Sequence, residues 1–340
     1  METPTDELKI NENQTVAVMS PTDRRADNLR RAGRFFSKYG IYFALVILVA
    51  VLAVISPPFF TAANLIDILR QISVIGILAV GQTVVIITAG IDLSVGSILA
   101  LSAVMAASFA HPGQYPLIVP LMVGLGAGLV CGALNGFLIA KSKLAPFIVT
   151  LGMMTAARGM ALVYTGGRPV FNLSNAYDTI GTGYLAGIPL PVVIFILVIL
   201  GGIFLLHYTR FGRYVYAVGG NELAAKVSGI STEKILIYVY ILQGVLAGVA
   251  GVVLSSRVMS ASPALGEGYE LDAIAAAVIG GTSLMGGVGT ITGTVVGALI
   301  IGVMNNGLDM LNVSSYWQQI VKGAIIVLAV LLDKKSKGKA

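Results

Sequence analysis

Five ionisable side chains lie within or beside long apolar stretches of this chain, namely Asp92, Arg158, Glu270, Asp272 and Lys322. An ionisable group is costly in lipid, so it usually faces a cavity or a partner. Such groups could gate a translocation path or pass a proton along it. For Asp92 and Asp272 we favour another role, the capping of a helix that begins beside them, because a carboxylate accepts free backbone N–H groups. Arg158 could pair with an acidic residue, which the sequence does not identify.

Five uncharged amides also lie inside apolar stretches. An amide can hydrogen-bond a sugar hydroxyl without the solvation cost of a charge. It can equally bond a neighbouring helix, which is the commoner outcome in membranes. Both roles stay open at this stage. These candidates for the lining of a translocation path are Gln82, Asn135, Gln243, Asn305 and Asn306.

The sequence carries no motif for catalysis or for metal binding. The phosphate-binding pattern GxxxxGK[ST] and the patterns HExxH and GxSxG do not occur. His111 and His207 are the only histidines, and they fall at opposite membrane faces in the topology below, so they cannot share a zinc ion. Cys131 is the only cysteine, which excludes an intramolecular disulfide. We therefore expect no enzyme activity and no bound metal or cofactor.

The composition is that of an integral membrane protein. Of the 340 residues, 56% are hydrophobic and 11% are charged, and the mean hydropathy is +0.88. Ordinary soluble domains have about 25% charged residues. Because a span needs roughly 17 to 25 mostly apolar residues, we predict an all-α bundle of about ten, at least eight, membrane helices. The candidate spans are 40–56, 71–89, 93–110, 117–140, 146–164, 190–208, 233–255, 271–285, 290–308 and 316–332.

The segment 271–285 is the weakest of these candidates. It is short and interrupted by glycine, and it could be re-entrant rather than spanning. Non-helical backbone survives at that depth only where protein or a wet cavity covers it.

Lysine and arginine residues predict the orientation. With ten spans and a cytoplasmic N-terminus, seventeen of them fall inside, and only Arg70, Arg168 and Arg257 fall outside. This asymmetry follows the positive-inside rule, so both termini are expected in the cytoplasm. We divide the chain into a disordered basic tail over 1–38, a membrane domain over 39–333 and a short basic tail over 334–340. The basic residues next to the first span indicate topology and not nucleic-acid binding.

Glycine is abundant, and it often recurs every three or four residues within the candidate spans. Examples are the stretches 124–136 and 287–302. Small residues at this spacing let helix backbones approach closely in lipid, so we predict tight helix packing. A shift of 171 residues also brings 135–152 over 306–323, with matching glycines and asparagines. This faint repeat suggests two inverted halves of five spans each.

One polar stretch, "RFGRYVYAVGGNELAAKVSGIS" at residues 210–231, separates two apolar runs and faces the cytoplasm in this topology. Gly219 and Gly220 are expected to break the preceding segment. Asn221 is a good N-cap, and Gly229 can end a helix in the left-handed conformation. The residues between them therefore predict one short helix.

This short helix has an apolar side. Leu223, Ala224 and Val227 fall together, while Glu222 and Lys226 point elsewhere. Because so short a helix is marginal alone in water, it needs a surface on which to dock. That surface could belong to a partner or to its own bundle.

Four strings resemble the permease subunits of ribose-type bacterial ABC sugar importers. They are "GRYVYAVGGNELAAKVSGI" (212–230), "GIDLSVGS" (90–97), "GYELDAIAAAVIGGTSLMGGVGT" (268–290) and "NNGLDMLNVSSYWQQIVKG" (305–323). The resemblance extends from about residue 40 to the C-terminus. It implies a permease that imports a monosaccharide, ribose or a relative, across the bacterial inner membrane.

The resemblance also implies partners. These are a second permease copy, identical or related, a cytoplasmic ATPase that binds ATP and Mg²⁺, and an extracytoplasmic sugar-binding protein. In such importers a short cytoplasmic helix of the permease docks on the ATPase, and here it would be Asn221 to Gly229. The loops 57–70, 165–189 and 256–270 would meet the binding protein. The candidate charged contacts are Asp67, Arg70, Arg168, Arg257 and Glu267.

Two other classes of protein remain open from the residues. One is an autonomous secondary transporter that couples uptake to protons through Asp92 or Asp272. It would need no ATPase. The other is a membrane-anchored scaffold, which would explain the basic tail but not the polar residues within the spans.

Overall fold

The computed structural model describes residues 40–337. The predicted tail 1–38 and the last three residues therefore lie outside the described part. Contacts divide the chain after Phe43, and the description below concerns the second unit. The first described helix, Gly40–Ile55, includes this division, and most of its residues belong to the second unit. The elements continue with η1 (Pro57–Phe60), α2 (Ala62–Ile87), α3 (Val95–Ser108), α4 (Ile118–Ser142), α5 (Pro146–Thr165), α6 (Asn175–Thr182), β1 (Tyr184–Leu185), β2 (Ile188–Pro189), α7 (Leu190–Tyr208), α8 (Arg210–Gly220), α9 (Glu222–Val227), α10 (Thr232–Arg257), α11 (Tyr269–Ile279), α12 (Ile291–Met310) and α13 (Ser315–Lys337).

The all-α prediction is confirmed, and each of the ten candidate stretches contains a helix. Within the described residues, six helices of 19 to 26 residues are long and apolar enough to cross a membrane, namely α2, α4, α5, α7, α10 and α12. The boundaries differ in places, because α2 begins nine residues before its predicted start. At the other end of the chain α13 continues to Lys337, through residues that the sequence assigned to a basic tail.

Three of the predicted spans, Gly40–Ile55, α3 and α11, are helices of fewer than 18 residues. α3 has 14 residues and α11 has 11. At 1.5 Å per residue, α11 covers only about half of the ~30 Å hydrocarbon layer. The irregular backbone after it is covered by protein, since the Gly287 N–H donates to the Ile87 carbonyl at 2.8 Å. This arrangement agrees with the sequence expectation of a broken segment at 271–285.

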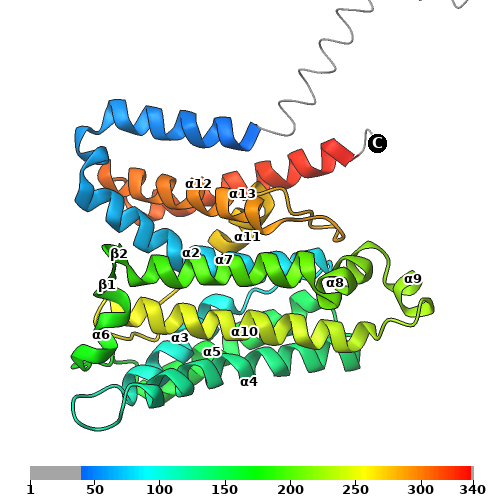
Figure 1. Ribbon diagram of the computed structural model, residues 1–340, viewed down its shortest axis with the longest axis horizontal. Helices are drawn as coiled ribbons and strands as arrows, with labels where there is room; N and C mark the ends of the chain where they lie inside the picture. The colour runs from blue at the N-terminus through cyan, green and yellow to red at the C-terminus, as the bar shows by residue number, and fades with distance from the viewer. Residues whose placement is uncertain (1–39, 338–340) are drawn as a thin grey trace, which may run out of the picture. The chain divides into compact units, whose positions relative to one another are not determined.

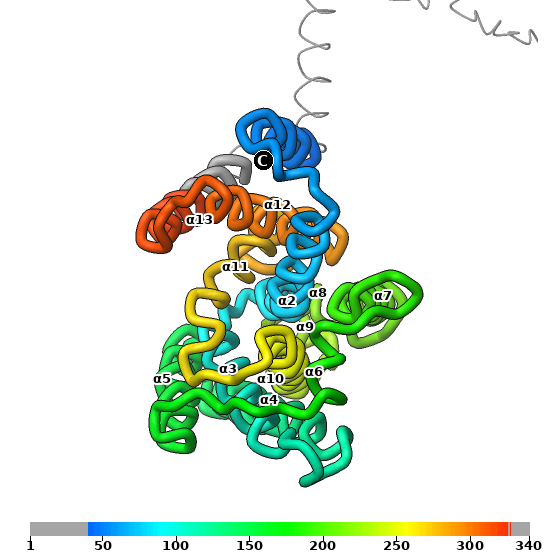
Figure 2. Tube along the Cα trace, turned by 90° about the vertical axis from the view of Figure 1, so that its left-hand side faces the viewer, coloured from blue at the N-terminus to red at the C-terminus, as the bar shows by residue number. Residues whose placement is uncertain are grey.

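Helix α2 is the most enclosed of the long helices. It packs against α7, α10, α11 and α12, which surround it in Figure 2. Of its most apolar stretch, 89% is buried, compared with 22% for the most apolar stretch of α7, which has the higher mean hydropathy (2.8 compared with 1.7). A helix that is apolar on every side and remains uncovered by protein is suited to face lipid. α2 therefore forms the centre of the bundle, and α7 lies at its periphery.

The contact between α4 and α10 is the most extensive between any two helices in the described chain, and the two run side by side in Figure 1. A Cβ atom on Gly128 would lie 2.2 Å from the Gly244 carbonyl oxygen, and one on Gly132 would lie 2.3 Å from the Tyr240 carbonyl oxygen. Only glycine permits this separation. The predicted packing role of the glycines at 124–136 is therefore confirmed.

The two halves of the bundle pack in a related pattern. α10 contacts both α3 and α4, and α3 also contacts α5. In the same way α2 contacts both α11 and α12, and α11 also contacts α13. Each of the central helices thus packs on one short and one long helix of the other half: α10 on α3 and α4, and α2 on α11 and α12.

Gly128→Ala is expected to destabilise the folded protein by about 1–3 kcal/mol, because the added methyl group collides with backbone that cannot rotate away. The matched control is Gly126→Ala on the same helix, where a Cβ atom meets nothing within 4 Å. Thermal unfolding of the purified protein in detergent measures both variants. Equal melting temperatures for the two variants would contradict the proposed α4–α10 packing.

Candidate functional site

The stretch 210–231 forms two helices, α8 and α9, and not one. Of the two glycines expected to break the preceding segment, Gly219 lies within α8, whereas Gly220 is its last residue. Gly219 instead lets α8 lie directly on the end of α2, since a Cβ atom there would be 1.6 Å from the Ile87 carbonyl oxygen. Asn221 provides the break between the two helices.

Helix α9 has the caps that the sequence predicts. The Asn221 side chain accepts a hydrogen bond from the Ala224 N–H at 2.9 Å, and Gly229 adopts a φ of +83° after the helix. Leu223 and Val227 are 78% and 90% exposed. Ala225 is the residue that turns inward and is buried. An apolar pair so exposed on a capped helix has the form of a docking surface.

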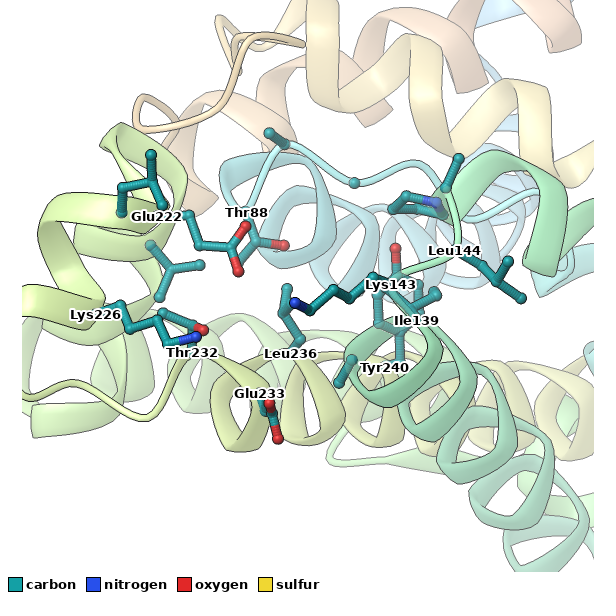
Figure 3. Close-up of a pocket in the computed structure, with 17 residues that line it drawn as sticks. Thr88, Ile139, Lys143, Leu144, Glu222, Lys226, Thr232, Glu233, Leu236 and Tyr240 are labelled. Carbon is teal, nitrogen blue, oxygen red and sulfur yellow. The ribbon is translucent and has the colours of Figure 1, made fainter.

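A cavity of about 480 Å³ lies beneath α9 (Figure 3). Its walls come from α9, the start of α10, the end of α4 and the link between α2 and α3. In Figure 3 Glu222 and Lys226 reach it from α9, and Lys143 reaches it from the α4 side. Near its rim, Lys141 and Glu233 form an ion pair at 2.5 Å that joins α4 to α10. Because both side chains are half-exposed, this pair adds little stability.

Asp92, Ser94 and Asn135 form a hydrogen-bonded chain in the core. Asp92 Oδ1 accepts from the Ser94 N–H at 2.8 Å and from the Ser94 hydroxyl at 2.5 Å. Asn135 Nδ2 then donates to Ser94 Oγ at 2.9 Å. All three side chains are fully buried. The Asp92 carboxylate thus holds the turn before α3 and, through Ser94, ties it to α4. Its hydrogen bonds go to Ser94 and not to N–H groups within α3, so the expected capping of that helix is not observed.

Two glutamines extend this chain to α2 and α10. The Gln82 amide lies 3.2 Å from the backbone N and O of Asp92, and the Gln243 Nε2 lies 3.3 Å from Gln82 Oε1. Tyr240 separates the cluster from the cavity under α9, because its hydroxyl packs on Gly90 and its side chain lines that cavity. We call Gln82, Asp92, Ser94, Asn135 and Gln243 the core polar cluster.

The core polar cluster is closed to solvent in this conformation. Gln82, Asn135 and Gln243 each have no exposed surface, and Asn135 donates to Ser94 on the segment before α3. A role for these three residues in lining a translocation path therefore stays a prediction. Ser94, which joins Asp92 to Asn135, was not singled out from the sequence, where a serine next to an aspartate is an ordinary turn signal.

A second polar group joins α11, α12 and α13. Asp272 Oδ2 accepts from Lys322 Nζ at 2.9 Å and from Asn305 Nδ2 at 3.2 Å. The carboxylate is 2% exposed. This corrects the preferred capping role of Asp272, because its hydrogen bonds go to two other helices. The pairing brings together three residues that the sequence marked separately.

Asn306 faces a different partner from its neighbour Asn305. Its amide exchanges two hydrogen bonds with the amide of Asn64 on α2, at 2.8 and 3.2 Å. Asn64 was missed from sequence because it lies near a helix start, where asparagine is common.

The predicted docking residues lie near the start of α2, after the end of α5, and between the end of α10 and the start of α11. These parts of the chain are at the end of the bundle opposite α9 in Figure 1. Asp67, Arg168 and Glu267 are exposed. Arg70 is engaged, since it donates to the Thr182 carbonyl at 3.1 Å and stacks on the ring of Tyr184. Arg257 is only partly exposed. The first three are therefore the more accessible members of this set.

The loops at this end are held by internal contacts. Val170 and Ala261 pair as an isolated β-bridge, and the Tyr177 hydroxyl lies 2.8 Å from Ser255 Oγ. Burial raises the pKa of the Asp178 carboxyl, which follows Tyr177 in α6.

Arg158 donates to the carbonyl oxygens of Pro263 and Leu265. Arg158 thus hydrogen-bonds backbone carbonyls, while the acidic side chains of Glu267 and Glu270 line the same cavity and interact with its charge. The described residues contain no group of three or more metal-binding side chains.

Comparison with known proteins assigns the chain to a family. Residues 64–330 match the family model described as "Branched-chain amino acid transport system / permease component". The chain is 47% identical over 305 residues to the ribose import permease protein RbsC of Haemophilus influenzae, covering 88% of this chain and 94% of that one. It is 49% identical over 300 residues to RbsC of Bacillus subtilis, covering 88% and 93%.

A further relative has another sugar in its name. The D-allose transport system permease protein AlsC of Escherichia coli is 42% identical over 301 residues, covering 88% of this chain and 92% of that one. No solved structure was found to match the chain. With its bundle of long apolar helices and these relatives along most of its length, the chain belongs to the family of membrane permease components that includes the ribose import permeases.

Proposed function

We propose that the chain is the membrane-spanning subunit of an ABC importer that moves a monosaccharide, ribose or a close relative, into the cytoplasm. The observation that carries the proposal is the 47–49% identity to ribose import permeases along most of the chain. ATP is hydrolysed by a separate subunit, and an extracytoplasmic binding protein delivers the sugar. The chain itself supplies the path and the coupling between its two ends.

In this proposal α9 docks on the ATPase subunit. Its exposed Leu223 and Val227 would enter a cleft on that partner, with Glu222 and Lys226 at the edge of the contact. α9 is joined through the short segment 228–231 to α10, which runs to the opposite end of the bundle. Motion of α9 could therefore move α10 as a rigid body and change which end is open.

The arrangement of helices supports an inverted repeat of four helices. The shift of 171 residues places α2 to α5 over α10 to α13, and each pair of matching helices has similar length. Residues 40–55 then fall on 211–226, which belong to α8 and α9, so a fifth pair is not supported. We infer ten membrane segments, including the short α3 and α11, with both ends of the chain in the cytoplasm.

A second permease copy is expected at α5 and α13. A Cβ atom added to Gly152 or Gly159 on α5, or to Gly323 on α13, would meet nothing within 4 Å. Small residues on an uncovered helix face let another helix approach closely in lipid. Whether the second copy is identical or related does not follow from this face.

Val227→Asp is expected to weaken binding of the ATPase subunit tenfold or more, because loss of an anchor at the centre of an interface costs about 2 kcal/mol or more. The matched control is Tyr115→Asp, which also replaces an exposed, largely apolar side chain by a charged one, but at the other end of the bundle. Co-purification of the ATPase with each variant is the measurement. If both variants retained the ATPase equally, the coupling role of α9 would be wrong.

The topology predicts opposite labelling of two engineered cysteines. A cysteine at Arg168 should react with a membrane-impermeant maleimide in intact cells, whereas one at Lys226 should react only after the membrane is opened. Both positions are exposed in the structure, so burial does not protect either. The reverse pattern would refute the orientation.

Reconstitution separates the importer from the proton-coupled alternative. Proteoliposomes with the chain, its ATPase and its binding protein should take up ribose only with ATP. The chain alone, under a proton gradient, should give no uptake. Uptake by the chain alone would establish a secondary transporter and overturn the proposal.

A further inference from the structure

A second cavity, of about 520 Å³, lies at the end of the bundle opposite α9. It opens between the start of α11 and the first turns of α13. Its lining is strongly polar for a membrane helix bundle. The side chains that the argument uses are Glu267, Glu270, Ser315, Gln318, Gln319 and Lys322.

The same two carboxylates border a neighbouring cavity of about 640 Å³ on the α5 side. There they meet Arg158, together with hydroxyl groups such as Thr155 and Ser262. Glu267 and Glu270 therefore stand between two cavities, with Arg158 on one side and Lys322 on the other. We call this pair of cavities the polar vestibule.

The groups of the polar vestibule are held in place. Glu270 packs against Gly96 of α3, where a Cβ atom would lie 2.3 Å from its Oε2. Lys322 is fixed by Asp272, and Gln318 Nε2 donates to Asp309 Oδ1 at 2.8 Å. Arg158 is fixed by two carbonyl groups. A preformed set of donors and acceptors is what a small polar ligand requires.

The balance of charge indicates the class of ligand. With Lys322 paired to Asp272, three carboxylates, Glu267, Glu270 and Asp272, face the two cations Lys322 and Arg158, so an anion is disfavoured. A neutral ligand with several hydroxyl groups could donate to the carboxylates and accept from the amides and from the lysine. Hydrogen bonds to charged groups are worth about 1.5–3 kcal/mol each when formed. The mixture of groups therefore suits a monosaccharide.

We propose that the polar vestibule holds the monosaccharide after its release from the binding protein and before the bundle opens inward. This inference rests on the proposed function and adds a sugar site on the permease itself. Glu267 and Gln319 are exposed, so solvent competes for these hydrogen bonds and binding should be weak. Weak binding suits a transit site, since a solute must also leave it.

Protection of an engineered cysteine tests the site directly. In the purified complex, Gln319→Cys and Ser315→Cys should react with a maleimide, and D-ribose at about 100 mM, enough to saturate a millimolar site, should slow labelling at both at least threefold. Tyr115→Cys, exposed at the same end but outside the vestibule, is the control that ribose should not protect. Cys131 is buried and should contribute little background.

Unchanged labelling at both vestibule positions, or failure of both to label in an active complex, would overturn the proposal. The second outcome would mean that another chain covers the cavity. Equal protection of Tyr115→Cys would also overturn it, because the effect would then be general.

Transport provides the second readout. Ser315→Ala combined with Gln319→Leu, which leaves the candidate docking residue Glu267 intact, should lower the number of sugar molecules imported per ATP at least threefold, while stimulation of the ATPase by the binding protein keeps its concentration dependence. If import per ATP were unchanged, the vestibule would not hold the sugar. Failure of the proposed function is distinguishable, because the unmodified complex would then show no ATP-driven uptake.

Discussion

The close approach of α4 and α10 is the constraint on which the rest of the structure depends. It exists because Gly128, Gly132 and Gly244 carry no side chain. Asn135 follows Gly132 by one helical turn, and Gln243 precedes Gly244, so the same approach brings both amides into the core polar cluster. Helix α10 itself extends from α9 at one end of the bundle to the loops held by the Val170–Ala261 bridge at the other end. One backbone contact thus sets the position of the core and of both ends.

Polar contacts between helices complete the bundle in two places. The core polar cluster links α2, α4 and α10, and the Asp272–Asn305–Lys322 group links α11, α12 and α13. Individual hydrogen bonds between membrane helices contribute only about 0.6–2 kcal/mol. Loss of one partner from a buried ion pair costs more, about 3–5 kcal/mol. Lys322 therefore strengthens the contact of α13 with α11, the helix that it contacts most.

Local features of the fold were predictable from sequence, whereas long-range pairings were not. The apolar stretches, the glycine spacing at 124–136 and the caps of α9 all depend on neighbours within a few residues. The partner of Asp272 lies 50 residues away, and Arg158 binds backbone carbonyls that no side-chain pattern reveals. Gly219 misled because its place inside a helix depends on the tertiary contact with Ile87. The polar vestibule could not be predicted from the sequence for the same reason, since its walls come from segments far apart in the chain.

The enclosure of α2 has a consequence for how the protein is made. Its main neighbours, α7, α10, α11 and α12, all lie later in the chain. During synthesis α2 therefore enters the membrane before the helices that will surround it, with Gln82 and its small residues facing lipid. The helix α2 must therefore remain in the membrane without its packing partners until the second half of the chain has been synthesised. A chain that stops after α5 would leave its own centre uncovered, so the insertion machinery, and not the bundle, must stabilise the early intermediate.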